Sequence, residues 1–184
     1  MPSLKTYFQK MKGGGYRSPH PINWGHALIA WVSGFLGIAL VGIFGTQQNI
    51  AAQDQLFLIG SFGATAVLLY STPFSPLAQP RHVIGGHLIS ALVGVVIYQL
   101  LPEPIWLASA LAVSTSILLM YLTTTTHPPG GATALIAVIG GDEIHALGFW
   151  YLLNPVLIAM LLMILVAVLV NNISPDRKYP KYWW

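Results

Sequence analysis

Long apolar runs alternate with short polar loops along this chain and divide it into six hydrophobic segments. Three segments are long enough to cross a hydrocarbon core of roughly 30 Å as helices, and they cover residues 24–45, 83–101 and 151–170. The segment 105–122 is close to that length, whereas the remaining two are shorter, at 56–70 and 130–140. This pattern predicts an all-α membrane protein in which two helices are short or broken.

The composition supports a membrane location for most of the chain. Charged residues make up 7% of the sequence and hydrophobic residues 55%, whereas about 25% of a typical soluble domain is charged. So few charges cannot cover the surface of a soluble protein of this size. We therefore expect a single transmembrane domain over residues 24–170, with short tails at 1–23 and 171–184.

The basic residues predict the orientation of that domain. They gather before the first segment and after the last, at Lys5, Lys10, Lys12, Arg17, Arg177, Lys178 and Lys181. Because cytoplasmic flanks collect Lys and Arg, we expect both termini in the cytoplasm, with the protein in a bacterial inner (plasma) membrane. If all six segments cross, the loop containing Arg81 also falls inside. The alternative, four transmembrane helices plus two re-entrant segments, places Arg81 outside.

A small-residue element occurs twice, once in each short segment. Gly63, Ala64, Thr65 and Ala66 reappear in the same order as Gly131, Ala132, Thr133 and Ala134. Each half of the domain, 24–101 and 105–170, then has the order helix, short segment, helix. Three crossings in each half predict a 3+3 inverted repeat, an architecture found in secondary transporters.

The stretch 123–129, TTTTHPP, predicts a break inside the membrane domain. Pro128 and Pro129 end the preceding helix and allow a new one to begin. A helix that begins inside the protein directs free N–H groups and a positive dipole end at its surroundings, which favours an anion. The candidate anion-binding residues are those of the two small-residue elements, Gly63, Ala64, Thr65, Gly130, Gly131, Ala132 and Thr133. Close helix packing in lipid uses the same residue types and is the competing interpretation.

Three ionisable residues are further candidates. His127 in the break and His87 in the third segment can carry a proton with the anion, with Pro128 and Pro129 as gating elements. Alternatively, His127 caps the preceding helix and His87 is an interfacial histidine bonded to a carbonyl. Arg81, at a helix entrance, can contact a planar oxyanion by two prongs, or it is a cytoplasmic anchor.

Several classes of function find no support. The chain has no cysteine, and no histidine pair stands at helical spacing beside a carboxylate, so we expect no metal. No nucleophile context, phosphate-binding loop or acid pair is present, and we expect neither an enzyme, a cofactor nor a nucleic-acid partner. A secondary transporter or channel for a small inorganic anion fits best, and a non-transporting membrane assembly subunit is the alternative. A homodimer is expected because a bundle this small buries little surface.

Two strings, SPLAQPRHVIGGHLISALVGV at 75–95 and THPPGGATALIAVIGG at 126–141, resemble the HPP family of small integral membrane proteins. The His-Pro-Pro of that family corresponds to His127, Pro128 and Pro129, and the resemblance covers about residues 24–170. Members are usually described with about four transmembrane helices, fewer than the six segments expected here. Plastid and cyanobacterial members are associated with nitrite transport. The resemblance therefore implies nitrite as the anion.

Overall fold

The computed structural model describes residues 5, 11, 23–47 and 60–184 of the chain. Every regular element among these residues is helical. Four helical segments are long and apolar enough to cross a membrane, namely α2 (Trp24–Thr46), α4 (Pro80–Leu100), α5 (Ile105–Leu122) and the continuous pair η3 (Leu152–Leu157) and α8 (Ile158–Asn171). The predicted all-α membrane architecture is confirmed.

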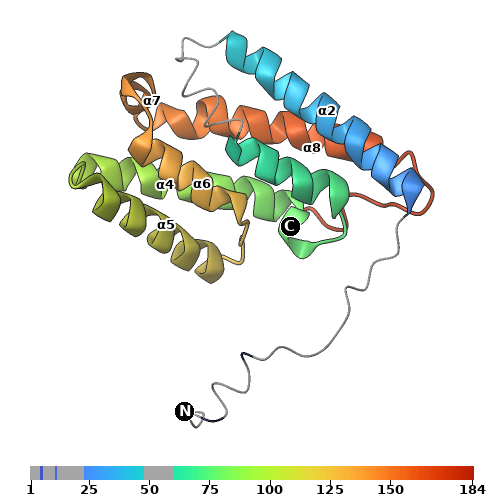
Figure 1. Ribbon diagram of the computed structural model, residues 1–184, viewed down its shortest axis with the longest axis horizontal. Helices are drawn as coiled ribbons and strands as arrows, with labels where there is room; N and C mark the ends of the chain where they lie inside the picture. The colour runs from blue at the N-terminus through green and yellow to red at the C-terminus, as the bar shows by residue number, and fades with distance from the viewer. Residues whose placement is uncertain (1–4, 6–10, 12–22, 48–59) are drawn as a thin grey trace.

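Two shorter apolar helices coincide with the repeated small-residue elements. One comprises residues 60–66 and continues into the π-helical turn η1 (Val67–Ser71), and the other is α6 (Pro129–Ile139). The beginning of the predicted segment 56–70 lies outside the described residues. Figure 1 shows that the described part of the first helix and α6 begin near the middle of the long dimension and run toward opposite ends. We refer to residues 60–71 and α6 as the short helices.

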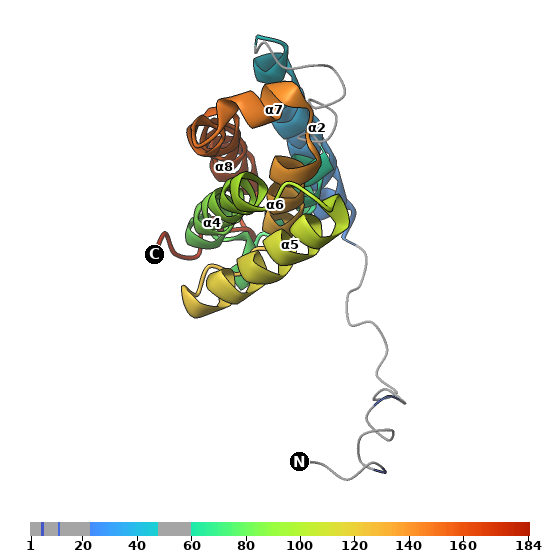
Figure 2. The ribbon, with the colours of Figure 1, turned by 90° about the vertical axis from the view of Figure 1, so that its left-hand side faces the viewer.

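The long helices pack in two groups around the short ones. Helix α2 lies along α8, whereas α4, α5 and α6 contact one another, and both ribbon views show α6 beside α4 and α5 (Figures 1 and 2). Two further short elements, η2 (Pro76–Ala78) and α7 (Asp142–Leu147), lie in stretches that the sequence analysis left as loops.

Glycines allow α4 and α6 to approach at backbone distance. A Cβ atom at Gly94 of α4 would lie 2.5 Å from the carbonyl oxygen of Ala134, and one at Gly130 of α6 would lie 2.9 Å from that of Gly86. Such small-residue contacts are the usual means of tight helix association in lipid. The packing interpretation of Gly130 and Ala134 therefore describes part of what these residues do.

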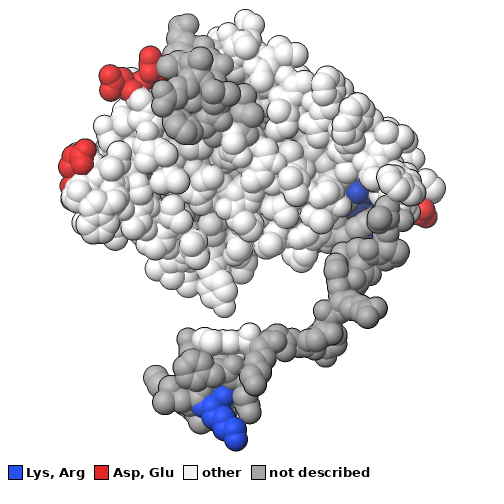
Figure 3. Space-filling model, in the orientation of Figure 1, with Lys and Arg blue, Asp and Glu red and all other residues white. Residues whose placement is uncertain are grey.

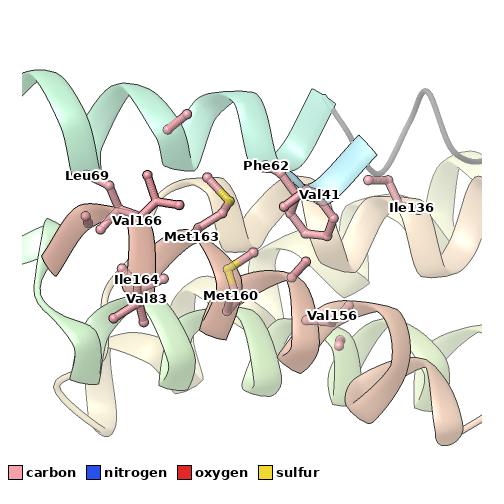
Figure 4. Packing of buried hydrophobic residues seen from close by; sticks show 14 of the residues in the cluster. Val41, Phe62, Leu69, Val83, Ile136, Val156, Met160, Met163, Ile164 and Val166 are labelled. Atoms are coloured by element: carbon pink, nitrogen blue, oxygen red, sulfur yellow. The ribbon is translucent and has the colours of Figure 1, made fainter. Parts of the chain in front are cut away.

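The apolar core lies between residues 60–71, α8 and α4. Met160 and Met163 of α8 pack near Phe62 and Leu69 of the first short helix (Figure 4). Tyr70 extends this core toward α2, where a Cβ at Gly37 would overlap its hydroxyl oxygen. That hydroxyl donates to the carbonyl of Met163 at 3.2 Å, so α2, α8 and the first short helix are joined at one buried point.

The predicted break between two helices is present at residues 123–128. Helix α5 ends at Leu122, and Thr124 follows in the left-handed region (φ 55°). The amide of Thr125 donates to the carbonyl of Met120 at 2.9 Å, which satisfies one of the last carbonyls of α5. Because Pro128 and Pro129 lack amide hydrogens, the chain begins a new helix only at Pro129.

The C-terminal residues that the sequence analysis treats as a tail pack against the domain. The Tyr179 hydroxyl donates to the carbonyl of Ala78 at 2.8 Å, and the Lys181 amide donates to Oε1 of Gln79 at 2.7 Å. Arg177 is 5% exposed. This segment therefore closes the end of the molecule where α8 ends and α4 begins.

The described charged residues leave a wide uncharged surface between the two ends of the molecule. On the face seen in Figure 3, acidic groups lie at the end where α4 meets α5 and α6 meets α7, and both a basic and an acidic group lie at the opposite end. Large apolar side chains are exposed between them, including Trp31 and Phe35 of α2 and Ile117 and Leu118 of α5. An uncharged apolar surface of this kind fits contact with lipid acyl chains.

Candidate functional site

Five buried polar side chains meet where the short helices, α4 and the 123–128 break come together. Each is at most 1% exposed, and they are Ser61, Thr65, His87, His127 and Thr133. We call this set the histidine network. Polar groups are costly at such depth unless they are hydrogen-bonded, and in this set each one is.

His87 of α4 joins the two short helices. Its Nε2 lies 2.8 Å from Oγ1 of Thr65, and its Nδ1 lies 2.7 Å from Oγ1 of Thr133. These two threonines are the third members of the repeated Gly-Ala-Thr-Ala elements. The repeat therefore places one hydroxyl from each half of the chain on a single imidazole ring.

His127 lies beside His87 because glycines admit the break against α4. A Cβ at Gly86 would lie 2.5 Å from Cβ of His127, and one at Gly85 would lie 2.6 Å from Cγ2 of Thr125. The two imidazole rings are 4.9 Å apart between centroids. The Gly85-Gly86-His87 sequence thus provides both the space for the break and the ring that faces it.

One tautomer of His127 follows from its hydrogen bonds. Nδ1 lies 2.8 Å from the carbonyl oxygen of Leu77, which can only accept, so Nδ1 carries a hydrogen. In the neutral ring Nε2 is then an acceptor, and it lies 3.2 Å from Oγ1 of Thr65. His127 therefore bonds a carbonyl of η2 through Nδ1, and not one of the last carbonyls of α5 as the capping interpretation predicts.

Ser61 completes the network and was not among the predicted site residues. Its hydroxyl oxygen lies 2.8 Å from Oγ1 of Thr133 and 3.1 Å from the carbonyl oxygen of Pro129. Ser61 and Thr65 stand four residues apart, on one helix face. Two hydroxyls at that spacing in an apolar run were the available sequence signal.

The network can hold its hydrogens in two opposite orders, because each hydroxyl has one hydrogen to donate. With His127 neutral, each group donates to the next one in the order Ser61, Thr133, His87, Thr65 and His127. With His127 protonated at Nε2, every donor direction reverses, and the chain ends with Ser61 donating to Pro129. A proton that arrives at one end can therefore be passed on by a shift of each hydrogen along the chain.

The first amides of α6 have partners in the protein. The amide of Gly130 donates to the carbonyl of His127 at 2.9 Å, and that of Gly131 to Pro128 at 3.1 Å. An anion must therefore replace these short-range bonds to use the helix start as the sequence analysis predicts. For the first short helix, residue 60 is already helical, so Gly63 and Ala64 lie within it, and its start lies outside the described residues.

The remaining predicted residues lie around the histidine network. Ala64 and Pro128 are exposed, and Ala132 is half-buried. Arg81 donates to the carbonyl of Thr123 at 3.1 Å and to Oγ1 of Thr124 at 2.7 Å. Arg81 therefore holds the corner after α5. It precedes His87 by six helical positions, about 9 Å along the axis, and is not part of the histidine network. No group of His, Asp and Glu able to bind a metal occurs among the described residues.

Two adjacent glycines of α6 provide a matched pair for mutation. A Cβ at Gly130 would lie 2.8 Å from Oγ of Ser90, whereas the nearest atom to one at Gly131 is Cγ1 of Val113 at 3.8 Å. We expect Gly130→Ala to lower the free energy of unfolding by about 1–3 kcal/mol through overpacking. Gly131→Ala should be neutral or stabilising by up to about 1 kcal/mol. Thermal unfolding in detergent measures both, and equal losses would contradict this placement of the two glycines.

The fold and the histidine network define an integral membrane protein built from long apolar helices, with a hydrogen-bonded polar centre where two short helices meet. The model of the family "HPP, transmembrane region" matches residues 19–180. The chain belongs to the HPP family, as the His127-Pro128-Pro129 motif and the surrounding strings predict.

Two curated relatives are similar over almost the whole chain. Both are Dictyostelium discoideum proteins named only as transmembrane proteins, and they are 44% and 42% identical over 97% of this chain. The matched region amounts to 63% and 57% of their lengths, so this chain spans about three fifths of each relative. No solved structure matches.

Proposed function

We propose that this protein is a secondary transporter or channel for a small inorganic anion, with nitrite as the first candidate. The observation that carries the proposal is His87, a fully buried ring bonded to one threonine from each short helix. Ionisable residues at membrane depth are expensive and generally serve transport or proton transfer. The choice of nitrite as the candidate substrate rests on the resemblance to family members associated with nitrite transport.

The proposal includes a 3+3 inverted repeat, with α2, residues 60–71 and α4 in one half and α5, α6 and η3–α8 in the other. Under that symmetry α2 against α8 corresponds to α5 against α4, and both pairs pack closely. The opposite directions of the short helices also fit this scheme (Figure 1). Transporters of this kind bind their substrate where broken helices meet.

Proton coupling accounts for the histidines. Moving one charge against the membrane potential costs about 2.3 kcal/mol per 100 mV, so uptake of a monovalent anion into a negative interior is opposed. A proton moving with the anion cancels that charge. The reversible donor order from Ser61 to His127 offers a path for the proton that needs no water at the network.

The anion is proposed to approach through the two open glycines. A Cβ at Gly63 would meet no described atom within 4 Å, and one at Gly131 would meet only Val113 at 3.8 Å. These equivalent positions leave backbone accessible beside Thr65 and Thr133. The amides of Gly130 and Gly131 would turn from their carbonyl partners to the anion, as helix starts do in other anion sites. If so, Gly131→Ala lowers nitrite flux without lowering stability.

Direct uptake tests the proposed substrate. Purified protein in liposomes should accumulate nitrite faster than protein-free liposomes at pH 8, where little of the membrane-permeant nitrous acid is present. Nitrate, formate and bicarbonate are offered as competitors in the same assay. Uptake equal to that of empty liposomes for nitrite and for every competitor would contradict the proposal.

The alternative function is that of a non-transporting membrane assembly subunit, in which the small residues serve packing alone. Thr65→Val and Thr133→Val distinguish the two functions because valine keeps the shape and removes the hydroxyl. We expect each variant to lose about 1–3 kcal/mol of stability, since a ring nitrogen of His87 loses its partner. Nitrite uptake should fall at least about tenfold, roughly what 1.4 kcal/mol in the transport barrier produces.

Thr46→Val is the control for these variants. Thr46 ends α2, and its exposed hydroxyl bonds only the nearby carbonyl of Ile43. It should keep wild-type uptake and stability. Folded Thr65→Val and Thr133→Val proteins with wild-type uptake would favour the assembly function.

Further parts of the proposal follow from charge and composition. Both termini are proposed to lie in the cytoplasm of a bacterial inner membrane, because Arg81 and the described basic residues of the C-terminal segment are near the same end of the helices. We propose a homodimer, for which the exposed apolar surfaces of α2 and α5 are available. No enzymatic activity, cofactor or nucleic-acid partner is proposed.

A further inference from the structure

A cavity lies at one end of the domain, lined by residues other than those of the histidine network. It has a volume of about 580 Å³ and lies between the start of α2, the turn after the first short helix and the C-terminal segment. Its polar lining consists of Asn23, His26, Ser71, Thr72, Ser75 and Arg177. We call this cavity the Arg177 pocket.

Arg177 brings to the pocket a buried positive charge that makes no ion pair among the described residues. Its Nη1 donates to Oδ1 of Asn171 at 3.0 Å and its Nη2 to the carbonyl of Tyr70 at 3.1 Å. Both acceptors are uncharged. Burial lowers the pKa of this guanidinium, but arginine remains cationic in proteins. Its buried Nε has no hydrogen-bond partner among the described residues, although such a donor ordinarily has one.

His26 provides a second group without a hydrogen-bond partner among the described residues that line the pocket. Its buried Nε2 has no hydrogen-bond partner in the described part of the chain, while its backbone amide is capped by Oδ1 of Asn23 at 3.0 Å. The 23-residue helix α2 begins here, so the positive end of its dipole also faces this region. Two orphaned nitrogens and a helix start thus converge on one cavity.

The chain offers little negative charge to neutralise this pocket. Its first acidic residue is Asp54, so no carboxylate occurs in the 22 residues that precede Asn23. Glu103, Asp142 and Glu143 lie at the other end of the helices. The exposed Asp176 directly precedes Arg177, but the two guanidinium nitrogens that make hydrogen bonds donate to uncharged acceptors. Lys181 adds a further positive charge nearby, with Nζ 4.7 Å from the ring centre of Phe74, which lines the pocket.

We propose that the Arg177 pocket binds one phosphate-type oxyanion, held between the Nε of Arg177 and the Nε2 of His26. Hydroxyls of Ser71, Thr72 and Ser75 are available as further donors. Ala27, Ala30 and Phe74 make the rest of the lining apolar, which fits the glycerol and first acyl carbons of a phospholipid as well as a free ion. The ligand is therefore either an anionic lipid headgroup or inorganic phosphate, and binding does not depend on whether the protein transports anions.

Thermal unfolding of the full chain in an uncharged detergent tests this site. Inorganic phosphate and a short-chain phosphatidylglycerol are titrated separately, with a short-chain phosphatidylcholine as the zwitterionic comparison. We expect at least one of the two anionic ligands to raise the unfolding temperature in a saturable way. Stabilisation by phosphatidylglycerol alone identifies a lipid headgroup as the ligand, and stabilisation by phosphate identifies the free ion as sufficient.

Three variants locate the site. His26→Ala removes a side chain that makes no hydrogen bond within the described residues, and it should weaken binding about tenfold, as for one lost hydrogen bond to an anion. Arg177→Gln should abolish binding. Arg177 also bonds Tyr70, so if Arg177→Gln does not fold, His26→Ala still tests the site. Lys178→Ala removes an exposed charge next to Arg177 but outside the lining and should bind as wild type.

Three outcomes would overturn the proposal. Neither phosphate nor phosphatidylglycerol changing the unfolding temperature would contradict it. Equal weakening by Lys178→Ala and His26→Ala would show a diffuse surface attraction, not a built site. Equal stabilisation by phosphatidylcholine and phosphatidylglycerol would show a response to acyl chains without recognition of the anion.

Discussion

His87→Gln should reduce nitrite flux by about 100-fold while the protein still folds. Glutamine can donate to one threonine and accept from the other, so Thr65 and Thr133 keep a bonding partner. It cannot take up a proton at one atom and release another from a second atom, as imidazole does. A positioned proton-transfer group typically contributes 10²- to 10⁴-fold to a rate, and we expect the lower end of that range.

His145→Gln is the control for this variant. His145 lies on α7 at the far end of the helices, where its Nε2 is 3.2 Å from the carbonyl of Val138 and its ring stacks on Tyr98. Its removal should leave nitrite flux at the wild-type level. A folded His87→Gln protein with wild-type flux would contradict a role for the buried ring in transport.

Gly94→Ala should destabilise the protein by about 3 kcal/mol, near the upper end for overpacking in a close-packed interior. The added Cβ would lie 2.5 Å from the carbonyl oxygen of Ala134 and 2.7 Å from Cβ of Ala137. Neither atom belongs to a flexible side chain, so α4 and α6 must separate. At 2–4 °C per kcal/mol for a chain of this size, the unfolding temperature should fall by roughly 6–12 °C.

Gly42→Ala provides the comparison. A Cβ at Gly42 of α2 would meet no described atom within 4 Å, and alanine is a better helix former than glycine. The unfolding temperature of this variant should equal or exceed that of the wild type. A Gly94→Ala protein that unfolds at the wild-type temperature would mean that α4 and α6 are not in backbone contact. Where Gly94→Ala folds, its flux should also fall, because separation of the helices parts Thr133 from His87.

Much of the helical framework could be predicted from hydrophobic run lengths. The prediction 105–122 coincides with α5, and 24–45 differs from α2 by one residue at its end. The break at Pro128 and Pro129 could also be predicted, because proline restricts its own backbone and that of the residue before it. Such effects are local and can be deduced from a few neighbouring residues.

Which residues form the site could not be predicted in full, because their contacts join segments that are far apart in the sequence. The Gly-Ala-Thr-Ala repeat identified Thr65 and Thr133, but their joint bond to His87 depends on how α4 lies between the two halves. Ser61 and Arg177 were missed as site residues for the same reason. Each makes a hydrogen bond to a residue at least 68 positions away, Ser61 to Pro129 and Arg177 to Tyr70. The lengths of the hydrophobic segments also do not distinguish a helix face covered by protein from one covered by lipid.

The central claim is that an anion and a proton cross the membrane together through the histidine network. Its most direct test is the internal pH of liposomes that contain the purified protein and a trapped pH indicator, after nitrite is added outside. The account predicts internal acidification faster than in protein-free liposomes, and a return to the protein-free rate with His87→Gln. Acidification at the same rate with and without the wild-type protein would contradict it.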